Sequence, residues 1–465
     1  MLELNNCLFT SAAGNAGWDY EHVLPYFKKS ENNLDDDIAA NTRYHSRGGL
    51  LPVAKFPYTD ENIPIMIRGF QDLGYKVVDF NADQVLGVSH LQGTQFSGKR
   101  GSTNAAFLEP FRQQRHNLKI VTGVRVTKIL IEADSNIAYG VEYVGEKNRD
   151  VTGRVFAGKE VIVSAGPINS PQLLLLSGIG PQETLQELGI PVVQNSSVGH
   201  NLQDHVGAYA VNYLVKNSTR PKSNDIIRDA DRYFRRGRRG PWSGIGSISV
   251  TAYVNTKYAN TSIDYPDVQF STIPSLSSVQ DLSCEVNFSI PWCYYNRVTF
   301  MPAVLRPKSR GYVTINSTDP FDLPLIYAKY FDDPQDMKVI IEAFNSATRL
   351  AETRTFRESG FVLDKTAPER CRHLEYGREE YWTCVAQEVT HSNYHVSGTC
   401  KMGPSSDPEA VVDPELKVRG VLNLRVIDSS IMPTIPSGNT NAPSIMIGEK
   451  GADIVKQAYG IPTGI

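Results

Sequence analysis

The spacing of apolar residues along the chain predicts a mixture of helices and strands. Residues 21–30 carry apolar side chains at helical spacing, with Pro25 as the point where this helix is expected to kink. Residues 62–73 repeat the pattern on one face and end at Gly74, a residue type that commonly terminates helices. Apolar and polar residues then alternate with the two-residue period of strands over residues 118–121, 124–132, 138–144 and 154–156.

The second half of the chain continues this mixture. Residues 342–352 have the pattern of a helix. Further strands are expected at residues 209–215, 247–254, 298–301 and 312–316. The dense charge run at residues 235–240 contains no aromatic residue that could stack on bases, so it is expected to be a solvated loop. The predicted fold class is therefore mixed, α/β with α+β character.

A short apolar run at residues 160–164 leads into a turn of small residues. Its length and composition predict a strand buried on both faces of a sheet. Ser170 and Pro171 follow, and these residue types favour the N-cap and first position of a helix, which should end at residues 177–181. A strand, a small-residue turn and a capped helix let a ligand phosphate approach the helix N-terminus. An ordinary strand–helix unit has the same pattern, and the residues alone leave both interpretations open.

Length and composition bound the kind of protein. A chain of 465 residues is long enough for two domains or one large composite fold. The apolar fraction of 41%, the charged fraction of 21% and the net charge of −3 favour a globular protein and give no reason to expect nucleic acid as a partner. No run approaches the roughly 18 consecutive apolar residues of a membrane span. The first residues also lack the basic and apolar regions of a signal peptide.

The six cysteines show no metal-binding spacing, because no Cys-x-x-Cys pair and no paired histidines are present. We therefore predict no metal site. Cys371 with Cys384, and Cys284 with Cys293, are close enough in sequence to close small disulfide loops, although six buried free thiols fit the spacing equally well. Taken with these pairs, five glycosylation triplets favour a secretory origin; they begin at Asn195, Asn217, Asn260, Asn287 and Asn316.

The residues with the clearest chemistry lie in the stretch 394–447. His395 stands beside a Gly-Thr turn, and the apolar residues 424–427 form a predicted strand that ends at Asp428. Asn439 stands beside a second glycine turn, which is followed by a helical pattern. A histidine, an acid and an amide on loops at strand ends are typical of an active site held by a rigid scaffold.

Three segments together carry a resemblance to a known family. Residues 166–180 read Gly-Pro-x-x-Ser-Pro-x-Leu-Leu-x-x-Ser-Gly-Ile-Gly, and residues 395–403 read His-x-x-Gly-Thr-x-x-Met-Gly. Residues 411–443 run from Val-Val-Asp-Pro through Asp-Ser-Ser-Ile-Met-Pro to Gly-Asn-Thr-Asn-Ala-Pro. This ordered set resembles the glucose-methanol-choline (GMC) flavin oxidoreductases, and most closely their insect glucose dehydrogenase group. Residues 98–108 and 201–205 fit the family as well, so the resemblance spans essentially the whole chain.

The resemblance implies an FAD-binding domain and a substrate domain built on an antiparallel sheet. The FAD domain would comprise residues 1–49 as a lid or N-terminal remnant, 116–204, and 404–465 as the C-terminal segment. The substrate domain would comprise residues 50–115 and 205–403, including the histidine loop. Family members begin with a βαβ unit whose Gly-x-Gly-x-x-Gly motif holds the FAD pyrophosphate, and this motif is missing here. We therefore expect an N-terminally truncated form of a protein that is secreted when full-length.

The resemblance also implies a reaction. An alcohol or sugar CH–OH group would be oxidised by hydride transfer to flavin N5, and quinone or oxygen would reoxidise the flavin. His395 matches the general base, and Asn439 matches a partner that can hydrogen-bond the substrate oxygen without titrating. The alternatives are a hydrogen-bonded structural histidine and a turn asparagine.

Cofactor contacts follow from the resemblance as well. Val126 matches a position near the adenine, and Asp428 with Ser429 matches the flavin end of the cofactor. Thr440 and Pro443 lie where the family backbone approaches the isoalloxazine. Two other functions stay open on this sequence. One is an inactive, flavin-poor homologue that has lost core strands, and the other is a lyase on the same scaffold.

Overall fold

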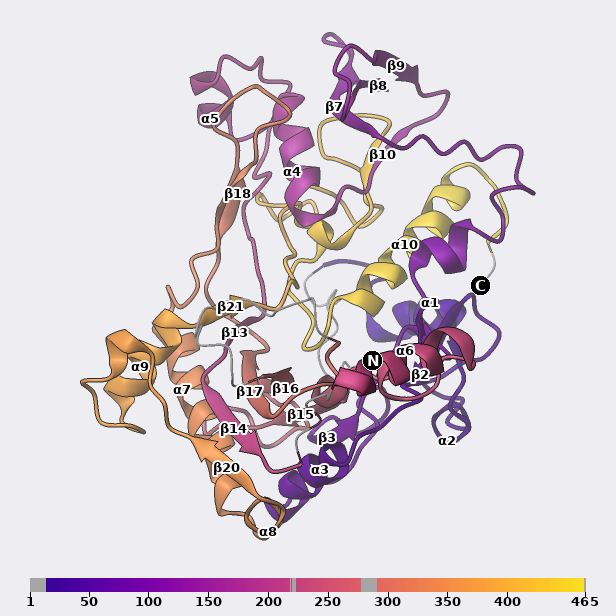
Figure 1. The fold of residues 1–465 in the computed structure, drawn as a ribbon. Coiled ribbons are helices and arrows are strands. Elements are labelled where there is room, and N and C mark those ends of the chain that lie inside the picture. Colours follow the sequence, from indigo (N-terminus) through magenta and orange to yellow (C-terminus); the bar gives the residue numbers. More distant parts are fainter. Residues whose placement is uncertain (1–13, 218, 220–222, 277–290, 464–465) are drawn as a thin grey trace.

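The computed structural model describes residues 14–217, 219, 223–276 and 291–463. Figure 1 shows a broad lower body of strands and helices, from which the region of α4, α5 and β7–β9 extends at the top. Within the described residues, no helix is both long enough and apolar enough to cross a membrane. Helices and antiparallel sheets are both present, so the predicted mixed α/β class is confirmed.

The lower body is built on an eight-stranded sheet. Its main path runs β20-β14-β17-β16-β15-β3, while β13 pairs with β17 and with β21. Every one of these pairings is antiparallel. The strands are β3 (Gly87–His90), β13 (Val206–Ala208), β14 (Val211–Val215), β15 (Val250–Val254), β16 (Val268–Ser275), β17 (Arg297–Val304), β20 (Phe361–Asp364) and β21 (Thr390–Ser392).

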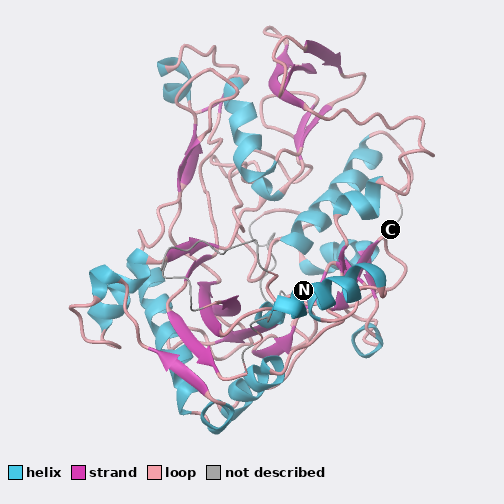
Figure 2. Ribbon diagram, viewed as in Figure 1, coloured by secondary structure: helices cyan, strands magenta, loops and turns pink. Residues whose placement is uncertain are grey.

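Helices cover this sheet and close the first hydrophobic core. α7 contacts β14, β16 and β17, while α3 contacts β3 and β15 and packs on α8. Figure 2 shows these helices along the outer margin of the lower strands. Phe70, Phe270, Phe300 and Phe344 are buried in this core, where the Phe70 ring packs at tilted angles against Phe270 and Phe300. The helices are α3 (Asn62–Asp72), α7 (Pro334–Thr348), α8 (Arg354–Ser359) and α9 (Glu379–Glu388).

A second core draws on segments from both ends of the chain. α1 packs against α10, and β10 pairs in parallel with β22. Trp18, Leu174 and Ile447 are among its buried side chains. Its elements are α1 (Tyr20–Ser30), β7 (Val124–Ile131), β8 (Ala138–Gly145), β9 (Thr152–Phe156), β10 (Val161–Val163), α4 (Gly166–Leu176), β22 (Leu424–Val426), the 3-10 turn η7 (Ser429–Ile431) and α10 (Asn441–Ala458). The domain boundaries stated from the sequence stay predictions.

Smaller elements complete the described chain. They include one large exposed helix, α6, beside the charge run at residues 235–240. These elements are β1 (Glu31–Asn33), α2 (Asp36–Ala39), β2 (Leu51–Lys55), β4 (Gln92–Gly93), β5 (Gln95–Phe96), β6 (Lys99–Arg100), the π-helical turn η2 (Asn104–Leu108), β11 (Ile179–Gly180), α5 (Gln182–Glu187), β12 (Gln194–Asn195), α6 (Ser223–Arg235), β18 (Tyr312–Thr314) and β19 (Leu325–Tyr327), with 3-10 turns η3 (Pro241–Ser243), η4 (Gly246–Ser249), η5 (Arg349–Glu352) and η6 (Glu369–Cys371).

Two strand expectations were wrong. Residues 118–121 are irregular, and their apolar side chains are partly exposed, with Val121 at 58%. β10 was expected to be buried on both faces, but Ile162 is 45% exposed. Among the described residues β10 pairs with β22 alone. An apolar run indicates that a strand is suited to burial. How much of its surface is actually buried depends on how many other strands lie beside it.

Two helices begin earlier than expected because the residues that cap them were not recognised. α4 begins at Gly166, with Ser170 and Pro171 inside it. The Asp428 carboxylate accepts hydrogen bonds from the Gly166 N–H and the Ser170 hydroxyl, so a distant acid replaces a local cap. α7 begins at Pro334, eight residues before the predicted start, because Asp333 caps it by accepting from the Gln335 N–H.

The predicted disulfide between Cys371 and Cys384 is confirmed, and it ties η6 to α9. Cys293 and Cys400 are buried free thiols, whereas Cys7 and Cys284 lie outside the described residues. Replacing both Cys371 and Cys384 by alanine should lower the free energy of unfolding by about 3 kcal/mol, since the bridge closes a short loop of the unfolded chain. Urea unfolding checks this value, and added reductant should destabilise the unsubstituted protein but not the double variant.

A buried histidine links three N-terminal segments. The Nδ1 atom of His45 lies 2.9 Å from Oε1 of Glu31, and its Nε2 atom lies 2.8 Å from Oδ2 of Asp79. Burial alone would lower the pKa of His45, but hydrogen bonds to the two carboxylates outweigh it and raise the pKa to about 9.

This cluster makes stability depend on pH. The folded-state pKa exceeds the unfolded value near 6.5, so the stabilisation is fully present below that pH and is lost as pH rises through about 9. Replacing His45→Gln should therefore cost on the order of 3 kcal/mol at pH 6 and little at pH 10. Urea unfolding across this range measures the difference, and a cost that does not vary with pH would contradict the assignment.

Candidate active site

Two histidines from distant segments meet at the end of the large sheet. β13 and β21 pair with Gly207 opposite His391, which brings the residue before β13 close to the loop after β21. As a result, Nδ1 of His205 lies 2.9 Å from Nδ1 of His395, with the rings nearly perpendicular. His205 Nε2 lies 3.1 Å from the Leu305 carbonyl oxygen, which follows β17.

A buried carboxylate holds the turn that presents His395. Asp204 accepts a hydrogen bond from the His395 backbone N–H and others from the hydroxyls of Ser392 and Tyr330. The residue between, Tyr394, has a φ of +58°, a conformation that costs energy for a side chain of this size. The Asp204 contacts on both sides of Tyr394 account for how this backbone conformation is maintained.

An amide pair completes the cluster on the other side of His395. Asn439 Nδ2 lies 3.1 Å from His395 Nε2, and Gln269 Nε2 donates to Asn439 Oδ1 at 3.1 Å. Gln269 is a buried residue of β16, whereas Asn439 precedes α10 and is exposed. The two residues that the sequence assigned to the reaction, His395 and Asn439, are therefore in direct contact.

Burial sets the charge state of both histidines. It lowers the pKa of His395 to about 4, and it lowers the pKa of His205 well below the ordinary value. Both rings are therefore neutral at neutral pH. A neutral imidazole has one ring nitrogen that can accept a proton, as a general base requires.

The histidine loop continues along η7 and the start of α4. The backbone N–H groups of Gly398 and Cys400 donate to the carbonyls of Ser429 and Ser430. The Thr399 hydroxyl donates to the Pro167 carbonyl. This places the predicted cofactor residues Asp428 and Ser429 next to the loop that carries His395. The Asp428 side chain itself is engaged by α4 and by the Ser430 N–H.

The remaining predicted residues are divided between two places. Thr440 and Pro443 are buried at the start of α10, directly after Asn439. Val126 is 39% exposed on β7. Figure 1 shows β7 at the top of the molecule, well away from β13 and β21, which hold the histidines. Within the described chain, no group of three or more histidines, cysteines or acids could hold a metal ion.

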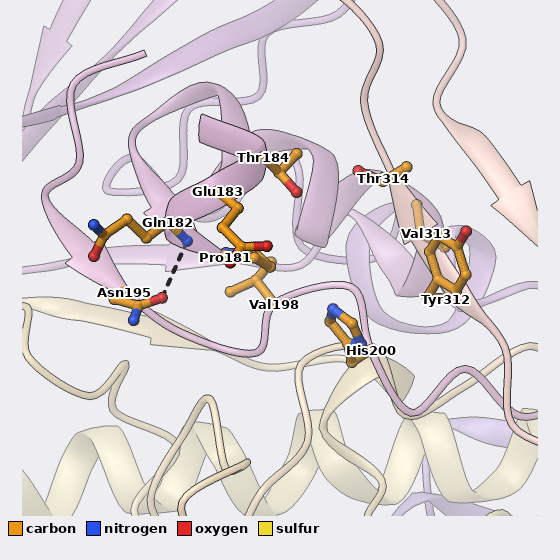
Figure 3. Close-up of a pocket in the computed structure, with 10 residues that line it drawn as sticks. All are labelled: Pro181, Gln182, Glu183, Thr184, Asn195, Val198, His200, Tyr312, Val313 and Thr314. Atoms are coloured by element: carbon orange, nitrogen blue, oxygen red, sulfur yellow. Dashed lines mark hydrogen bonds between the residues drawn. The ribbon is translucent and has the colours of Figure 1, made fainter. Parts of the chain in front are cut away.

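A cavity of about 590 Å³ lies apart from the histidine pair. Figure 3 shows it between the α5–β12 region and β18, with His200 and Tyr312 on one side and Gln182 and Asn195 on the other. The rings of His200 and Tyr312 stack with centroids 6.0 Å apart. None of the residues that line this cavity belongs to the cluster around His395.

Sequence patterns did not assign a role to three residues of this cluster. Asp204 and His205 belong to a segment that fits the family resemblance, but nothing in its spacing indicates that it faces a loop about 190 residues later. Gln269 lies within an ordinary strand pattern and belongs to no motif. Only the pairing of β13 and β16 with β17 shows that His205 and Gln269 belong to one site, because Gly207 and Gln269 both lie opposite Ala303.

Family models describe most of the chain. The N-terminal GMC oxidoreductase model matches residues 9–207, and the C-terminal GMC oxidoreductase model matches residues 307–448. The chain is thus built on an oxidoreductase scaffold. The chain belongs to the GMC oxidoreductase family, which confirms the resemblance seen in its motifs.

Individual relatives agree with this assignment. The chain is 41% identical to a glucose dehydrogenase [FAD, quinone] from Drosophila pseudoobscura pseudoobscura, over 97% of this chain and 70% of the relative. It is 37% identical to the human mitochondrial choline dehydrogenase over 95% of this chain and 70% of that protein. A solved FAD-dependent oxidoreductase from Chaetomium thermophilum shares the fold with a TM-score of 0.82 at 23% identity, covering 97% of this chain and 83% of that one.

Proposed function

We propose that this protein is an FAD-dependent dehydrogenase that oxidises the CH–OH group of a sugar or another alcohol, with His395 as the general base. The observation that carries the proposal is the contact between His395 Nε2 and the Asn439 amide, 3.1 Å apart at the start of α10. A neutral histidine beside an exposed hydrogen-bond donor is suited to bind a hydroxyl and take its proton. FAD, when bound, would supply the hydride acceptor that no side chain can provide.

The chain offers suitable places for this cofactor. α10 begins without a side-chain cap at its N-cap residue Thr440 and so presents a positive helix end, whereas the Asp428 carboxylate already accepts hydrogen bonds at the start of α4. A Cβ at Gly166, at the start of α4, would meet no atom within 4 Å, which leaves room beside the carboxyl ends of β10 and β22. Phosphate and other electron-rich groups bind at such helix ends.

The predicted contacts would hold the two ends of this cofactor in different regions, one at β7 and the other near the histidine loop. Val126 would lie near the adenine, and Asp428 with Ser429 would lie at the flavin end. The backbone at Thr440 and Pro443 would approach the isoalloxazine. Because the Asp428 carboxylate already accepts three hydrogen bonds, we propose that it acts by fixing the start of α4 and η7. Its own oxygens need not touch the cofactor.

Each residue of the cluster has a distinct part in the proposed reaction. The substrate hydroxyl would lie between His395 and Asn439, donating to His395 Nε2 and accepting from Asn439 Nδ2. His395 would take the hydroxyl proton as the carbon-bound hydrogen leaves as hydride. Asp204 would keep the His395 backbone in place through its bond to the N–H group.

The relatives indicate a substrate class and an electron acceptor. The relatives named glucose dehydrogenase [FAD, quinone] share 40–41% identity with this chain. We therefore propose a sugar as substrate and a quinone, in preference to oxygen, as acceptor. Ecdysone oxidase from Spodoptera littoralis is 33% identical, which makes a steroid alcohol the second substrate to examine.

A titration with FAD tests the proposal. The purified chain should acquire a visible flavin spectrum, and anaerobic addition of glucose or another alcohol should bleach it. Addition of a quinone should then restore the oxidised spectrum faster than air does. Absence of bound flavin under saturating FAD would contradict the proposal and favour an inactive homologue.

We also propose that the protein is secreted and glycosylated. Asn195, Asn260 and Asn316 are exposed and begin glycosylation triplets, whereas Asn217 is half-buried and Asn287 lies outside the described residues. Production through an insect-cell secretory pathway should add glycans at Asn260 and Asn316, both of which lie in loops. Peptide mass spectrometry before and after enzymatic deglycosylation measures occupancy, and unmodified asparagines at both positions would refute the proposal.

A further inference from the structure

His395 belongs to a hydrogen-bonded chain of side chains that ends on a backbone carbonyl at each side. In one direction the chain runs from His395 to His205 and on to the Leu305 carbonyl. In the other direction it runs through Asn439 and Gln269 to Thr251, whose hydroxyl donates to the Phe270 carbonyl at 2.8 Å. The positions of the protons along this chain can be derived from its two ends, because a backbone carbonyl can only accept.

The Leu305 end determines where each imidazole carries its proton. His205 Nε2 must donate to the Leu305 carbonyl, so this nitrogen carries the hydrogen. His205 is fully buried and neutral, so its Nδ1 has a lone pair that accepts from His395 Nδ1. His395 is therefore protonated at Nδ1, and its Nε2 carries the lone pair.

The Phe270 end leads independently to the same result. Thr251 donates its only hydroxyl proton to the Phe270 carbonyl and accepts from Gln269 Nε2 at 3.3 Å. The same Gln269 amide group donates to Asn439 Oδ1, so Asn439 turns its NH₂ group towards His395. A nitrogen that faces an NH₂ group must accept. His395 Nε2 again carries the lone pair.

We propose that His205 and Gln269 are positioning residues that hold His395 in the Nδ1–H tautomer, with the Nε2 lone pair directed at the substrate oxygen. The opposite tautomer would place two N–H groups together at Asn439, and on the other side it would place two acceptors together, either between the imidazoles or between His205 and the Leu305 carbonyl. Either arrangement loses buried hydrogen bonds, each worth about 1 kcal/mol or more. The tautomer follows from the contacts alone, while its catalytic consequence rests on the function proposed above.

The same series of hydrogen bonds stabilises His395 after it takes a proton. When Nε2 becomes protonated, Nδ1–H still donates to His205, so only the contact with Asn439 has to change. The substrate oxygen would already have replaced that contact. Two charged residues lie near the pair, Asp204 at the His395 backbone and Arg306 next to Leu305. Neither forms a side-chain hydrogen bond to an imidazole nitrogen among the described contacts.

¹⁵N NMR identifies the tautomer of His395 and does not require catalytic activity. The chain labelled with ¹⁵N-histidine contains nine histidines, and the His395→Gln spectrum identifies the His395 signal by its loss. Two-bond correlations to the ring hydrogens should show His395 as the Nδ1–H form, with or without FAD. His205→Leu removes the acceptor and should shift His395 towards Nε2–H. His205→Gln keeps one acceptor and one donor and should restore Nδ1–H. His200→Leu, an exposed residue on the same segment, should leave the His395 signal unchanged.

A second variant changes the hydrogen bonds on the Asn439 side of His395. Gln269→Glu replaces the donor with an acceptor, so Asn439 should turn its NH₂ group away from His395 and favour the Nε2–H form. Thermal unfolding shows whether His205→Leu is folded. If it is not, the Gln269→Glu variant still tests the proposal. An Nε2–H signal in the unsubstituted protein overturns the proposal. So does an Nδ1–H signal that persists in every folded variant with a changed partner.

Kinetics separate the positioning role from the proposed function. His205→Leu should lower kcat 10–100-fold with a smaller change in KM, because the misdirected lone pair hinders proton removal more than it weakens the single hydrogen bond to the bound hydroxyl. His205→Gln should recover most of this loss. A KM increase at unchanged kcat overturns the positioning role. If the unsubstituted protein has the Nδ1–H form but its bound flavin is not reduced by any alcohol, the tautomer assignment stands and the proposed function fails.

Discussion

Replacing His395→Ala should slow alcohol-dependent reduction of bound FAD by about 10³-fold, within the range found when a general base is removed. The imidazole is the only titratable ring in direct contact with Asn439 among the described residues. Without it, the hydroxyl proton would have to pass to water. Anaerobic stopped-flow reduction measures the rate, with flavin content determined for each preparation.

The matched control is His391→Gln, on β21 and four residues earlier. Its ring lies against Tyr209 and Tyr394 and forms no hydrogen bond to His395 or Asn439. This variant should retain reduction within a few-fold of the unsubstituted protein. If His395→Ala binds FAD and still reduces it within tenfold of that rate, another group is the base.

Replacing Gly398→Ala should be among the most destabilising single changes in the chain, at about 3 kcal/mol or more. Gly398 has a φ of +88°, and a Cβ there would stand 2.5 Å from the backbone carbonyl oxygen of Asn201. Neither the turn nor that carbonyl can move freely, because Gly398 N–H donates to Ser429 and its own carbonyl accepts from the Asn201 amide. The variant should also displace His395 and reduce activity.

Gly377→Ala separates the two causes of this destabilisation. Gly377 has nearly the same φ, +89°, but a Cβ there would meet no atom within 4 Å. It should therefore show only the conformational cost of about 1–2 kcal/mol for a left-handed residue. Urea unfolding of both variants gives the difference. Equal losses would mean that the histidine loop adjusts to the extra carbon without strain.

The sequence indicated that His395 and Asn439 belong to one site, but it did not indicate the residues that support them. His395 and Asn439 were recognised because each stands in a motif of several residues, and the structure places them in contact. Their partners His205 and Gln269 lie 190 and 170 residues away along the chain. A hydrogen bond over such a separation leaves no periodic pattern in the sequence, since strand pairing, and not spacing, creates it.

Errors in the predicted elements have a related cause. The start of α4 was misplaced because its cap, Asp428, comes from 262 residues later, while Ser170 looked like a local cap. The Asp333–Pro334 pair that begins α7 was a local signal and could have been found. Ile162 shows that an apolar strand residue is buried only when a neighbour is available to cover it.

The histidine loop is attached to both hydrophobic cores. At one end β21 joins the large sheet, and at the other end residues 398–402 bond to η7 in the second core. The reacting geometry therefore depends on the assembly of segments that are far apart in the chain, which is slow because loop closure must precede any gain from the contacts. A folding intermediate with one formed core would lack the site, so recovery of activity during refolding should lag behind recovery of helical signal.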